Sequence, residues 1–353
     1  MGFLQNAVFA VFIFLNTFVS GALGFFHLAS TAPLNTTVQS SFSTTSNKAQ
    51  PIAASLAGPL WIPLSQSEAT TSPGWFIQNG LVVYQGAMDS GGNLVNRIVQ
   101  IDPNTFLVSA SDLDFGKDNS NVYYDGALIG GSDPNSFTVL GAPYDDGQHN
   151  GDYAKDKLSA YYQDSASSGT VTPIPGADVA TFVSIGYGYA KDNRFVYLFG
   201  DVISAADQKT FVVLGLADSP EGSLSGDTYA EDRTHVFLNG NAVSSNVDVG
   251  SFSLIRDSSG EPTSYAKDKS HVYNAYDCTT IDGADPATFT VLNTYYAKDK
   301  YNVYSFDGPG GNVAGTSVAL IGADPATFQL VSGASSYDAT DGRHKYNHGW
   351  PVD

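Results

Sequence analysis

The sequence predicts an all-β repeat protein of about seven four-stranded antiparallel units, arranged like a β-propeller and preceded by an apolar N-terminal helix. The alternative is an open β-repeat array or solenoid. Three observations support this fold class. Gly (36), Tyr (20) and Phe (21) are abundant, as in short strands joined by tight turns. A hairpin-like motif recurs about every 37 residues, and a second motif alternates with it, which indicates a repeat architecture.

The chain begins with an apolar segment, residues 1–26, that contains no charged residue. It is long enough to cross a bilayer as a helix, and it ends in small residues typical of a signal-peptidase site. We therefore expect export, with the segment either cleaved as a signal peptide or kept as a membrane anchor. A helix that assembles filament subunits is a further alternative.

Residues 27–74 are rich in Ser, Thr, Ala and Pro and show no periodicity, so we expect a linker there. Asn35 begins a glycosylation sequon in this linker. The β-repeat domain is expected to span residues 75–353.

The first motif is clearest at residues 265–273 (YAKDKSHVY) and 296–304 (YAKDKYNVY). Polar turn residues flanked by alternating strands predict a β-hairpin in which Ala faces Tyr and Lys faces Val. The residue three after the Asp is expected to close the turn. The marker positions are Asn79, Asp118, Asp156, Asp192, Asp232, Asp268, Asp299 and Asp341.

The second motif is Asp-x-x-Ser/Thr-Phe, and it falls between successive hairpins. It predicts one capped helical turn in which Asp is the cap and Phe is anchored in the core. Its copies begin at Asp102, Asp133, Asp178, Asp207, Asp248, Asp285 and Asp324. Each period then holds four strands: a after the Phe, b and c in the hairpin, and d after it. This is the size of a propeller blade, so seven periods fit a seven-bladed ring, with eight blades as the near alternative.

The alternating strand directions place the b–c and d–a turns on one side of the sheets and the a–b and c–d connections on the other. All the longer insertions fall in the second group, which is the usual place for binding in repeat folds. These insertions are Ala87 to Arg97, Ala142 to Gly151, Gln163 to Thr172, Ala217 to Asp227 and Asp307 to Ser317.

The hairpin motif together with the Gly-Ala-Asp-Pro-Ala-Thr-Phe runs at 283–289 and 322–328 resembles the DKNYY family of bacterial repeat proteins. The resemblance covers about residues 75–346. It implies a bacterial envelope protein or an exported protein, and it supplies no catalytic residues. The first and last copies depart from the pattern, with Asn79 for Asp and Lys345 for Val, as expected of terminal caps.

The net charge of −19 disfavours nucleic acid and anionic lipid as partners and favours calcium or cationic partners. An acidic cluster in one insertion gives the candidate binding residues Asp145, Asp146, His149 and Asp152. Of these, Asp145, Asp146 and Asp152 are also candidate calcium ligands, although the spacing differs from an EF-hand loop. The Asp of each hairpin is expected to serve its turn rather than a metal.

No catalytic set emerges from the sequence. The single cysteine, Cys278, excludes an intrachain disulfide and is expected to be an incidental small residue. His235, His271 and His344 occupy one repeat position and are expected to be structural. We find no nucleophile elbow, zinc-protease helix or phosphate-binding loop.

These observations favour an exported, non-enzymatic scaffold that presents a variable loop face to a protein or glycan at the cell surface. An extracellular enzyme acting on polysaccharide and a self-assembling surface or filament subunit are the alternatives. No cofactor is expected unless calcium binds.

Overall fold

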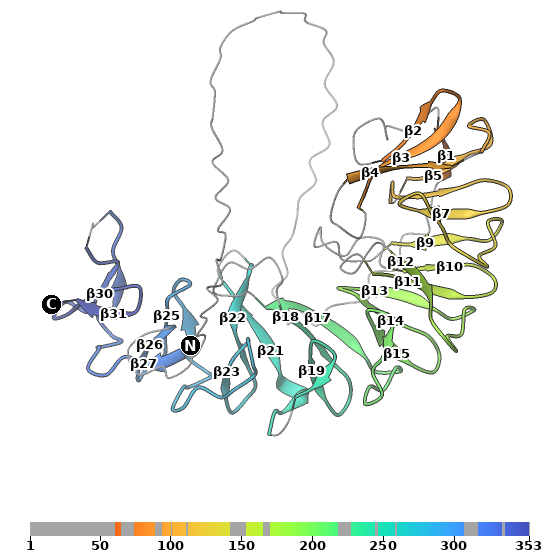
Figure 1. The fold of residues 1–353 in the computed structure, drawn as a ribbon. Coiled ribbons are helices and arrows are strands. Elements are labelled where there is room, and N and C mark those ends of the chain that lie inside the picture. The colour runs from red at the N-terminus through yellow and green to blue at the C-terminus, as the bar shows by residue number, and fades with distance from the viewer. Residues whose placement is uncertain are drawn as a thin grey trace, which may run out of the picture. The chain divides into compact units, whose positions relative to one another are not determined.

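The computed structural model is an all-β protein built from small antiparallel sheets (Figure 1). The residues it describes are 61–64, 74–88, 94–99, 101–110, 112–141, 153–164, 170–217, 227–243, 246–257, 260–306, 317–333 and 336–352. Among these residues the structure contains a short 3-10 turn, Val249–Ser251, and no helix long and apolar enough to cross a membrane. The predicted apolar helix at 1–26 lies outside these residues and stays a prediction.

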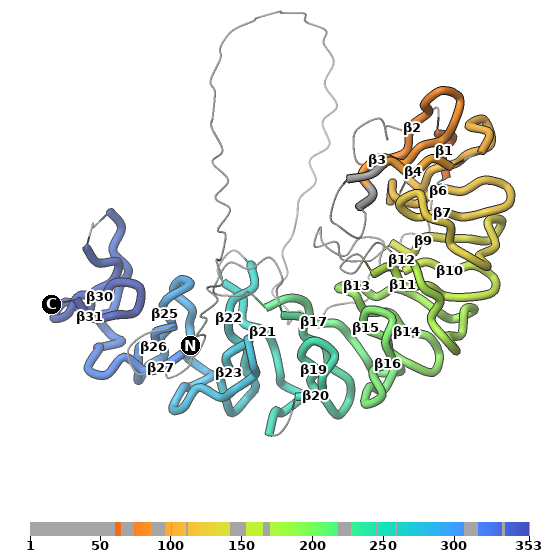
Figure 2. Tube along the Cα trace, viewed as in Figure 1, coloured from red at the N-terminus to blue at the C-terminus, as the bar shows by residue number. Residues whose placement is uncertain are grey.

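The strands form eight sheets, which we number 1 to 8 in the order of their hairpins (Figures 1 and 2). Sheet 1 contains β2 (Gly74–Gln78), β3 (Leu81–Met88) and β4 (Leu94–Val99). Sheet 2 contains β1 (Trp61–Pro63), β5 (Leu107–Ser109), β6 (Phe115–Lys117), β7 (Val122–Tyr124) and β8 (Ala127–Leu128). Sheet 3 contains β9 (Thr138–Leu140), β10 (Tyr153–Lys155), β11 (Ala160–Asp164) and β12 (Thr170–Pro173). Sheet 4 contains β13 (Val183–Gly186), β14 (Tyr189–Lys191), β15 (Val196–Leu198) and β16 (Asp201–Val202).

The second half of the chain continues the same pattern. Sheet 5 contains β17 (Val212–Ala217), β18 (Asp227–Glu231), β19 (Val236–Leu238) and β20 (Asn241–Ala242). Sheet 6 contains β21 (Ser253–Arg256), β22 (Pro262–Lys267) and β23 (Val272–Asn274). Sheet 7 contains β24 (Thr290–Val291), β25 (Tyr296–Lys298), β26 (Val303–Phe306) and β27 (Ser317–Ala319). Sheet 8 contains β28 (Gln329–Leu330), β29 (Ala339–Thr340), β30 (Lys345–Asn347) and β31 (Trp350–Val352).

The hairpin register is the one that the sequence predicts. In sheet 6, Ala266 pairs with Tyr273 and Lys267 pairs with Val272. The turn closes where the backbone N–H of Asp268 donates to the carbonyl of His271 at 3.0 Å. This order of strands puts the b–c and d–a turns at one end of the strands, which we call the short-turn side. The a–b and c–d connections lie at the opposite end of the strands, which we call the loop side.

The second motif forms a single turn before each strand a. At Asp285 the carboxylate Oδ1 accepts the N–H of Ala287 at 2.9 Å, and the Asp285 carbonyl accepts the N–H of Thr288 at 3.2 Å. The Asp therefore caps the turn as predicted. The Phe that ends the turn, Phe289, is buried, as are all its counterparts: Phe106, Phe137, Phe182, Phe211, Phe252 and Phe328.

Each buried Phe packs between rings of two successive sheets. Phe289 lies 5.2 Å from Tyr265 of sheet 6 and 5.4 Å from Tyr304 of its own sheet, measured between ring centroids. The seven core clusters repeat this arrangement, and each joins one sheet to the next. Strands b and c are therefore covered on both faces, which explains why both faces carry buried residues, with Ala266 on one face of strand b and Tyr265 on the other.

Two parts of the predicted organisation are revised. The described residues form eight sheets, the near alternative to seven, because seven steps separate eight hairpins and each hairpin forms a sheet of its own. Trp61–Pro63 lie within the predicted linker 27–74 but form β1, which pairs with β5. A closed ring is not shown, and no core cluster among the described residues joins sheet 8 to sheet 1.

The two end sheets differ from the internal ones. Among the described residues sheet 1 has no strand a, and its hairpin turns through Asn79 and Gly80, both with positive φ. In sheet 8 the exposed Lys345 occupies the position of the buried Val303 of sheet 7. A charged residue at this position is expected of a terminal cap.

Candidate functional site

The hairpin Asp is buried in six of its seven copies, and its carboxylate accepts several hydrogen bonds. Asp268 is 3% exposed. Its Oδ1 accepts the backbone N–H groups of Ser270 and His271 at 2.6 and 2.7 Å. Its Oδ2 accepts the hydroxyl of Tyr273 at 2.7 Å and the backbone N–H of Asp248 at 2.9 Å. The same four donors surround Asp156, Asp192 and Asp299. At Asp232 the three backbone donors remain, Phe237 replaces the Tyr, and the hydroxyl of Thr234 donates to Oδ1 at 3.1 Å.

These bonds keep the carboxylate charged inside the fold. Burial alone would raise the pKa of Asp268, but the donated hydrogen bonds outweigh it and lower that pKa to about 2. A carboxylate with four protein donors has little capacity left for a metal ion. The predicted turn role of the hairpin Asp is thus confirmed.

The repeated Lys and Tyr of strand b hold successive sheets together. Lys155 of sheet 3 donates to the carbonyls of Val179 and Phe182 in the turn before sheet 4, at 3.2 and 2.9 Å. Near the loop side, the hydroxyl of Tyr153 donates to the carbonyl of Gly188 at 2.8 Å. It also accepts the N–H of Gly200 at 3.1 Å. The lysines and tyrosines of the repeat are therefore structural links rather than a binding surface.

The three repeated histidines lie beside these carboxylates. The Nδ1 atoms of His235, His271 and His344 are 3.4, 3.7 and 3.2 Å from the Asp carboxylate of their own hairpin. Their rings are half exposed at the short-turn side, so the structural role that the sequence predicts fits this placement.

The binding residues that the sequence proposes lie outside the described residues. Asp145, Asp146, His149 and Asp152 all fall in the stretch 142–152, and the candidate calcium site stays a prediction. In the portion of the chain that the structure describes, no three His, Cys, Asp or Glu side chains are grouped so as to hold a metal ion.

A second acidic cluster, at the junction of sheets 1 and 2, is absent from the sequence predictions. The hydroxyl of Tyr84 in sheet 1 donates to Asp114 Oδ1, and Arg97 Nη1 donates to the carbonyl of Asp125 at 3.0 Å. Burial, and then the nearby charges of Asp114 and Asp125, raise the pKa of Asp112 to about 7. These carboxylates come from two different connections, so no local motif reveals them.

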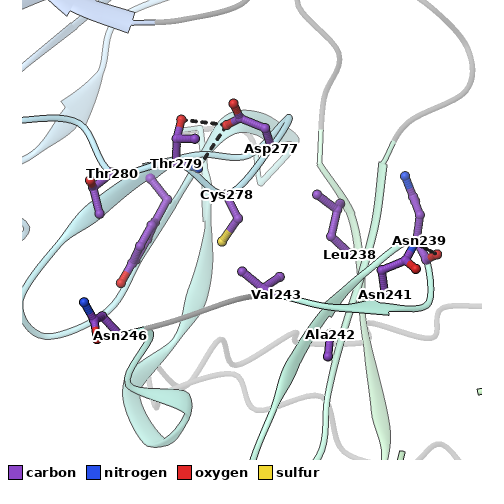
Figure 3. Close-up of a pocket in the computed structure, with 11 residues that line it drawn as sticks. Leu238, Asn239, Asn241, Ala242, Val243, Asn246, Asp277, Cys278, Thr279 and Thr280 are labelled. Atoms are coloured by element: carbon purple, nitrogen blue, oxygen red, sulfur yellow. Dashed lines mark hydrogen bonds between the residues drawn. The ribbon is translucent and has the colours of Figure 1, made fainter. Parts of the chain in front are cut away.

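Two grooves open beside the c–d turns of sheets 4 to 6. The groove between sheets 5 and 6, the 5–6 groove, has a volume of about 610 Å³ (Figure 3). Val243 and Cys278 point toward one another across it. Its lining residues are Leu238, Asn239, Asn241, Ala242, Val243, Asn246, Tyr273, Asp277, Cys278, Thr279 and Thr280. Burial raises the pKa of the Cys278 thiol to about 11, so the thiol is a poor nucleophile at neutral pH.

The neighbouring 4–5 groove has a volume of about 500 Å³ and is lined mainly by the c–d segment of sheet 4. It shares Asn239, Asn241 and Ala242 with the 5–6 groove, so this segment of sheet 5 lines both grooves. The half-exposed Phe199 stands at its loop-side end, with Asp201 and Ser204 along its length. In the sequence, Phe199 looks like one more core aromatic, and only its place before Gly200 in a tight turn sets it apart.

Comparison with known proteins identifies the repeat. A sequence model of the DKNYY family matches three overlapping stretches, residues 76–241, 115–277 and 265–342. No curated protein matches the chain, and no solved structure does.

Proposed function

The chain belongs to the DKNYY family, and from that premise we propose that it is an exported, non-enzymatic β-repeat protein that presents its loop side to a protein or glycan at the cell envelope. The observation that carries this proposal is the difference between the two sides of the sheets. On the short-turn side, the repeated Asp and Lys groups bond to one another's turns and hold the fold together. On the loop side the connections differ in length, and two grooves begin at the c–d turns and extend along strand d.

A surface that varies over a constant scaffold is the usual location of recognition in repeat proteins. The scaffold here is constant because each hairpin Asp is fixed by its own turn and each buried Phe by its neighbouring rings. The loop side can therefore change without loss of the fold. This favours binding over a fixed catalytic centre.

The placement at the envelope rests on residues 1–26, whose length and lack of charge favour a signal peptide or an anchor. The mass of the mature protein distinguishes the two, since cleavage removes this segment. Retention in the membrane fraction at full mass supports the anchor. A full-length protein in the cytoplasm contradicts export.

We also propose that the eight sheets form an open series. The seven core clusters join the sheets in sequence order, and sheet 8 carries the exposed Lys345 where sheet 7 buries Val303, which supports an open end rather than the predicted ring. Small-angle X-ray scattering tests this, because an open series has a larger maximum dimension than a closed ring of the same mass. A compact, disc-like profile would contradict it.

Binding itself is tested with the full chain immobilised and exposed to envelope extract and to a glycan array. One variant shortens the loop-side insertion Asp307 to Ser317. A matched variant replaces two exposed apolar residues of the short-turn side, Leu158 and Tyr301, by Ser. We expect shortened loops to reduce binding and the short-turn variant to keep it. Unchanged binding by the shortened-loop variant together with lost binding by the short-turn variant would contradict the proposal.

A further inference from the structure

We propose that Asn79 is a site of spontaneous chemical modification, at which the side-chain amide is lost and the residue becomes isoaspartate. This inference goes beyond the proposed function and concerns sheet 1, at the N-terminal end of the series. The chain contains three Asn-Gly pairs, which begin at Asn79, Asn150 and Asn239. Asn150 lies outside the described residues, so the proposal rests on a comparison of Asn79 with Asn239.

The reaction needs no catalytic group. The backbone N–H of the residue after Asn gives its proton to hydroxide, and its nitrogen bonds to the side-chain carbon Cγ. The side-chain nitrogen takes a proton from water and leaves as ammonia, which completes a five-membered succinimide ring. Water then adds to one of the two ring carbonyls and opens the ring to Asp or to isoaspartate. Glycine favours the first step because it has no Cβ to obstruct the approach and few restrictions on its φ and ψ angles.

The two pairs form the same kind of turn. Asn79 and Gly80 have φ values of 54° and 76°, and Asn239 and Gly240 have φ values of 47° and 76°. In each case they are the two central residues of a tight hairpin loop. A difference in reactivity between the pairs must therefore come from the groups that surround each turn.

The turn at Asn239 is held at every group that the reaction uses. Asn239 Oδ1 accepts the backbone N–H of Thr228 at 2.9 Å, and its Nδ2 donates to Asp227 Oδ1 at 2.7 Å. The N–H of Gly240, which would supply the attacking nitrogen, donates to the hydroxyl of Tyr189 in sheet 4 at 3.0 Å. A Cβ at Gly240 would overlap a side chain of that sheet, so the turn has little room to move. Ring closure at Asn239 must first break these hydrogen bonds.

The turn at Asn79 has none of these restraints among the described residues. The side chain of Asn79 is exposed and makes no hydrogen bond there, and the N–H of Gly80 makes none either. A Cβ at Gly80 would meet nothing within 4 Å, so open space surrounds the turn. Local opening of such an exposed turn costs little free energy, and it lets the Gly80 nitrogen reach Cγ of Asn79.

Isoaspartate at residue 79 changes the backbone of sheet 1 as well as its charge. The main chain then runs through the former side chain and gains one methylene group in the turn. The two-residue loop fixes the pairing of Gln78 with Leu81 and, through it, the register of β2 with β3. A longer connection cannot keep this geometry, so we expect the hairpin to open from its turn. Trp75 and Tyr84, farther from the turn, should stay packed on sheet 2.

The test is peptide mapping by mass spectrometry after incubation of the full chain in mildly alkaline buffer. Trypsin places the three sites in separate peptides, because Arg97 lies between the first two and Lys155 between the last two. We expect Asn79 to gain the mass of deamidation about tenfold faster than Asn239 or more. The main product should be isoaspartate, which elutes apart from the Asp peptide.

Two controls separate the effect of the fold from that of the sequence. In urea the two sites should convert at equal rates, because each is followed by Gly and no fold restrains either. Asp227→Ala removes the acceptor of the Asn239 amide and should speed conversion at Asn239 alone. In the modified protein, hydrogen exchange should rise in residues 77–82 and stay unchanged in sheet 2.

Equal rates at Asn79 and Asn239 in the folded chain, or faster conversion of Asn239, would overturn this inference. Unchanged hydrogen exchange in sheet 1 after modification would overturn the consequence assigned to it. Neither result touches the proposed function, because the turn of Asn79 is a b–c turn on the short-turn side.

Discussion

The carboxylate of Asp268 accepts the hydroxyl of Tyr273 at 2.7 Å, across the hairpin that separates them by five residues. The same pair recurs as Asp156 with Tyr161, Asp192 with Tyr197 and Asp299 with Tyr304. Strand c is thereby tied to its own turn, and through Oδ2 to the turn that begins strand a. This hydrogen bond therefore stabilises each of these hairpins.

Removing either partner should destabilise the protein. We expect Tyr273→Phe to lower the free energy of unfolding by about 1 kcal/mol, the net value of one hydrogen bond. Asp268→Asn should cost about 2 kcal/mol or more, because the amide cannot accept from every donor around it. Urea denaturation measures both, and Asp282→Asn, at an exposed carboxylate without a bond in the described residues, is the control. Equal midpoints for Asp268→Asn and Asp282→Asn would contradict the network.

Acid should unfold the protein through these carboxylates. The folded pKa of Asp268 is about 2, below its ordinary value of 3.8, and the pKa values of Asp192, Asp232 and Asp299 are also lowered by backbone hydrogen bonds that outweigh burial. A lowered folded pKa gives stability that is present above pH 4 and lost as pH falls from about 4 toward 2. Urea midpoints across this range should drop steeply, and Asp268→Asn should drop less. A flat profile would refute the assignment.

Asp112 should act in the opposite direction. Its folded pKa of about 7 exceeds the ordinary value of 3.8, so folding favours the protonated form. Its contribution to stability is therefore present below pH 4 and lost as pH rises from about 4 to 7. Asp112→Asn keeps an acceptor for the N–H of Asp114 and should raise the urea midpoint at pH 8 but not at pH 4. If Asp112→Asn changed the urea midpoint by the same amount at pH 4 and at pH 8, this assignment would be disproved.

Two glycines separate backbone strain from steric overlap. Gly188 and Gly283 have nearly equal φ, 74° and 75°, but only at Gly188 would a Cβ overlap another side chain, the ring of Phe199. Gly283→Ala should cost about 1 kcal/mol from backbone strain alone, and Gly188→Ala about 2–3 kcal/mol. Thermal unfolding compares the two. The additional loss of stability at Gly188 should disappear in the double variant Gly188→Ala with Phe199→Asn. If the additional loss persists in that variant, the ring of Phe199 is not its cause.

The sequence predicts the local structure well and the assembly of units less well. The register of Ala266 with Tyr273 and the burial of Phe289 follow from periodicity and turn chemistry, which act over a few residues. The place of Trp61–Pro63 in sheet 2 does not, because three residues including a Pro carry no strand pattern. The cluster of Asp112, Asp114 and Asp125 and the groove beside Phe199 depend on connections brought together only by folding.

The exposed Lys345 of sheet 8 has a consequence for how such chains change length during evolution. Each internal sheet offers its neighbour a small apolar residue, Val or Ala, and an aromatic ring, so a whole unit of about 37 residues can be duplicated between two existing ones. A unit stacked on this face of sheet 8 would have to bury the charge of Lys345. Duplicated units are therefore expected between existing internal sheets rather than after sheet 8. Longer and shorter relatives should differ by internal units and retain the basic residue at the end.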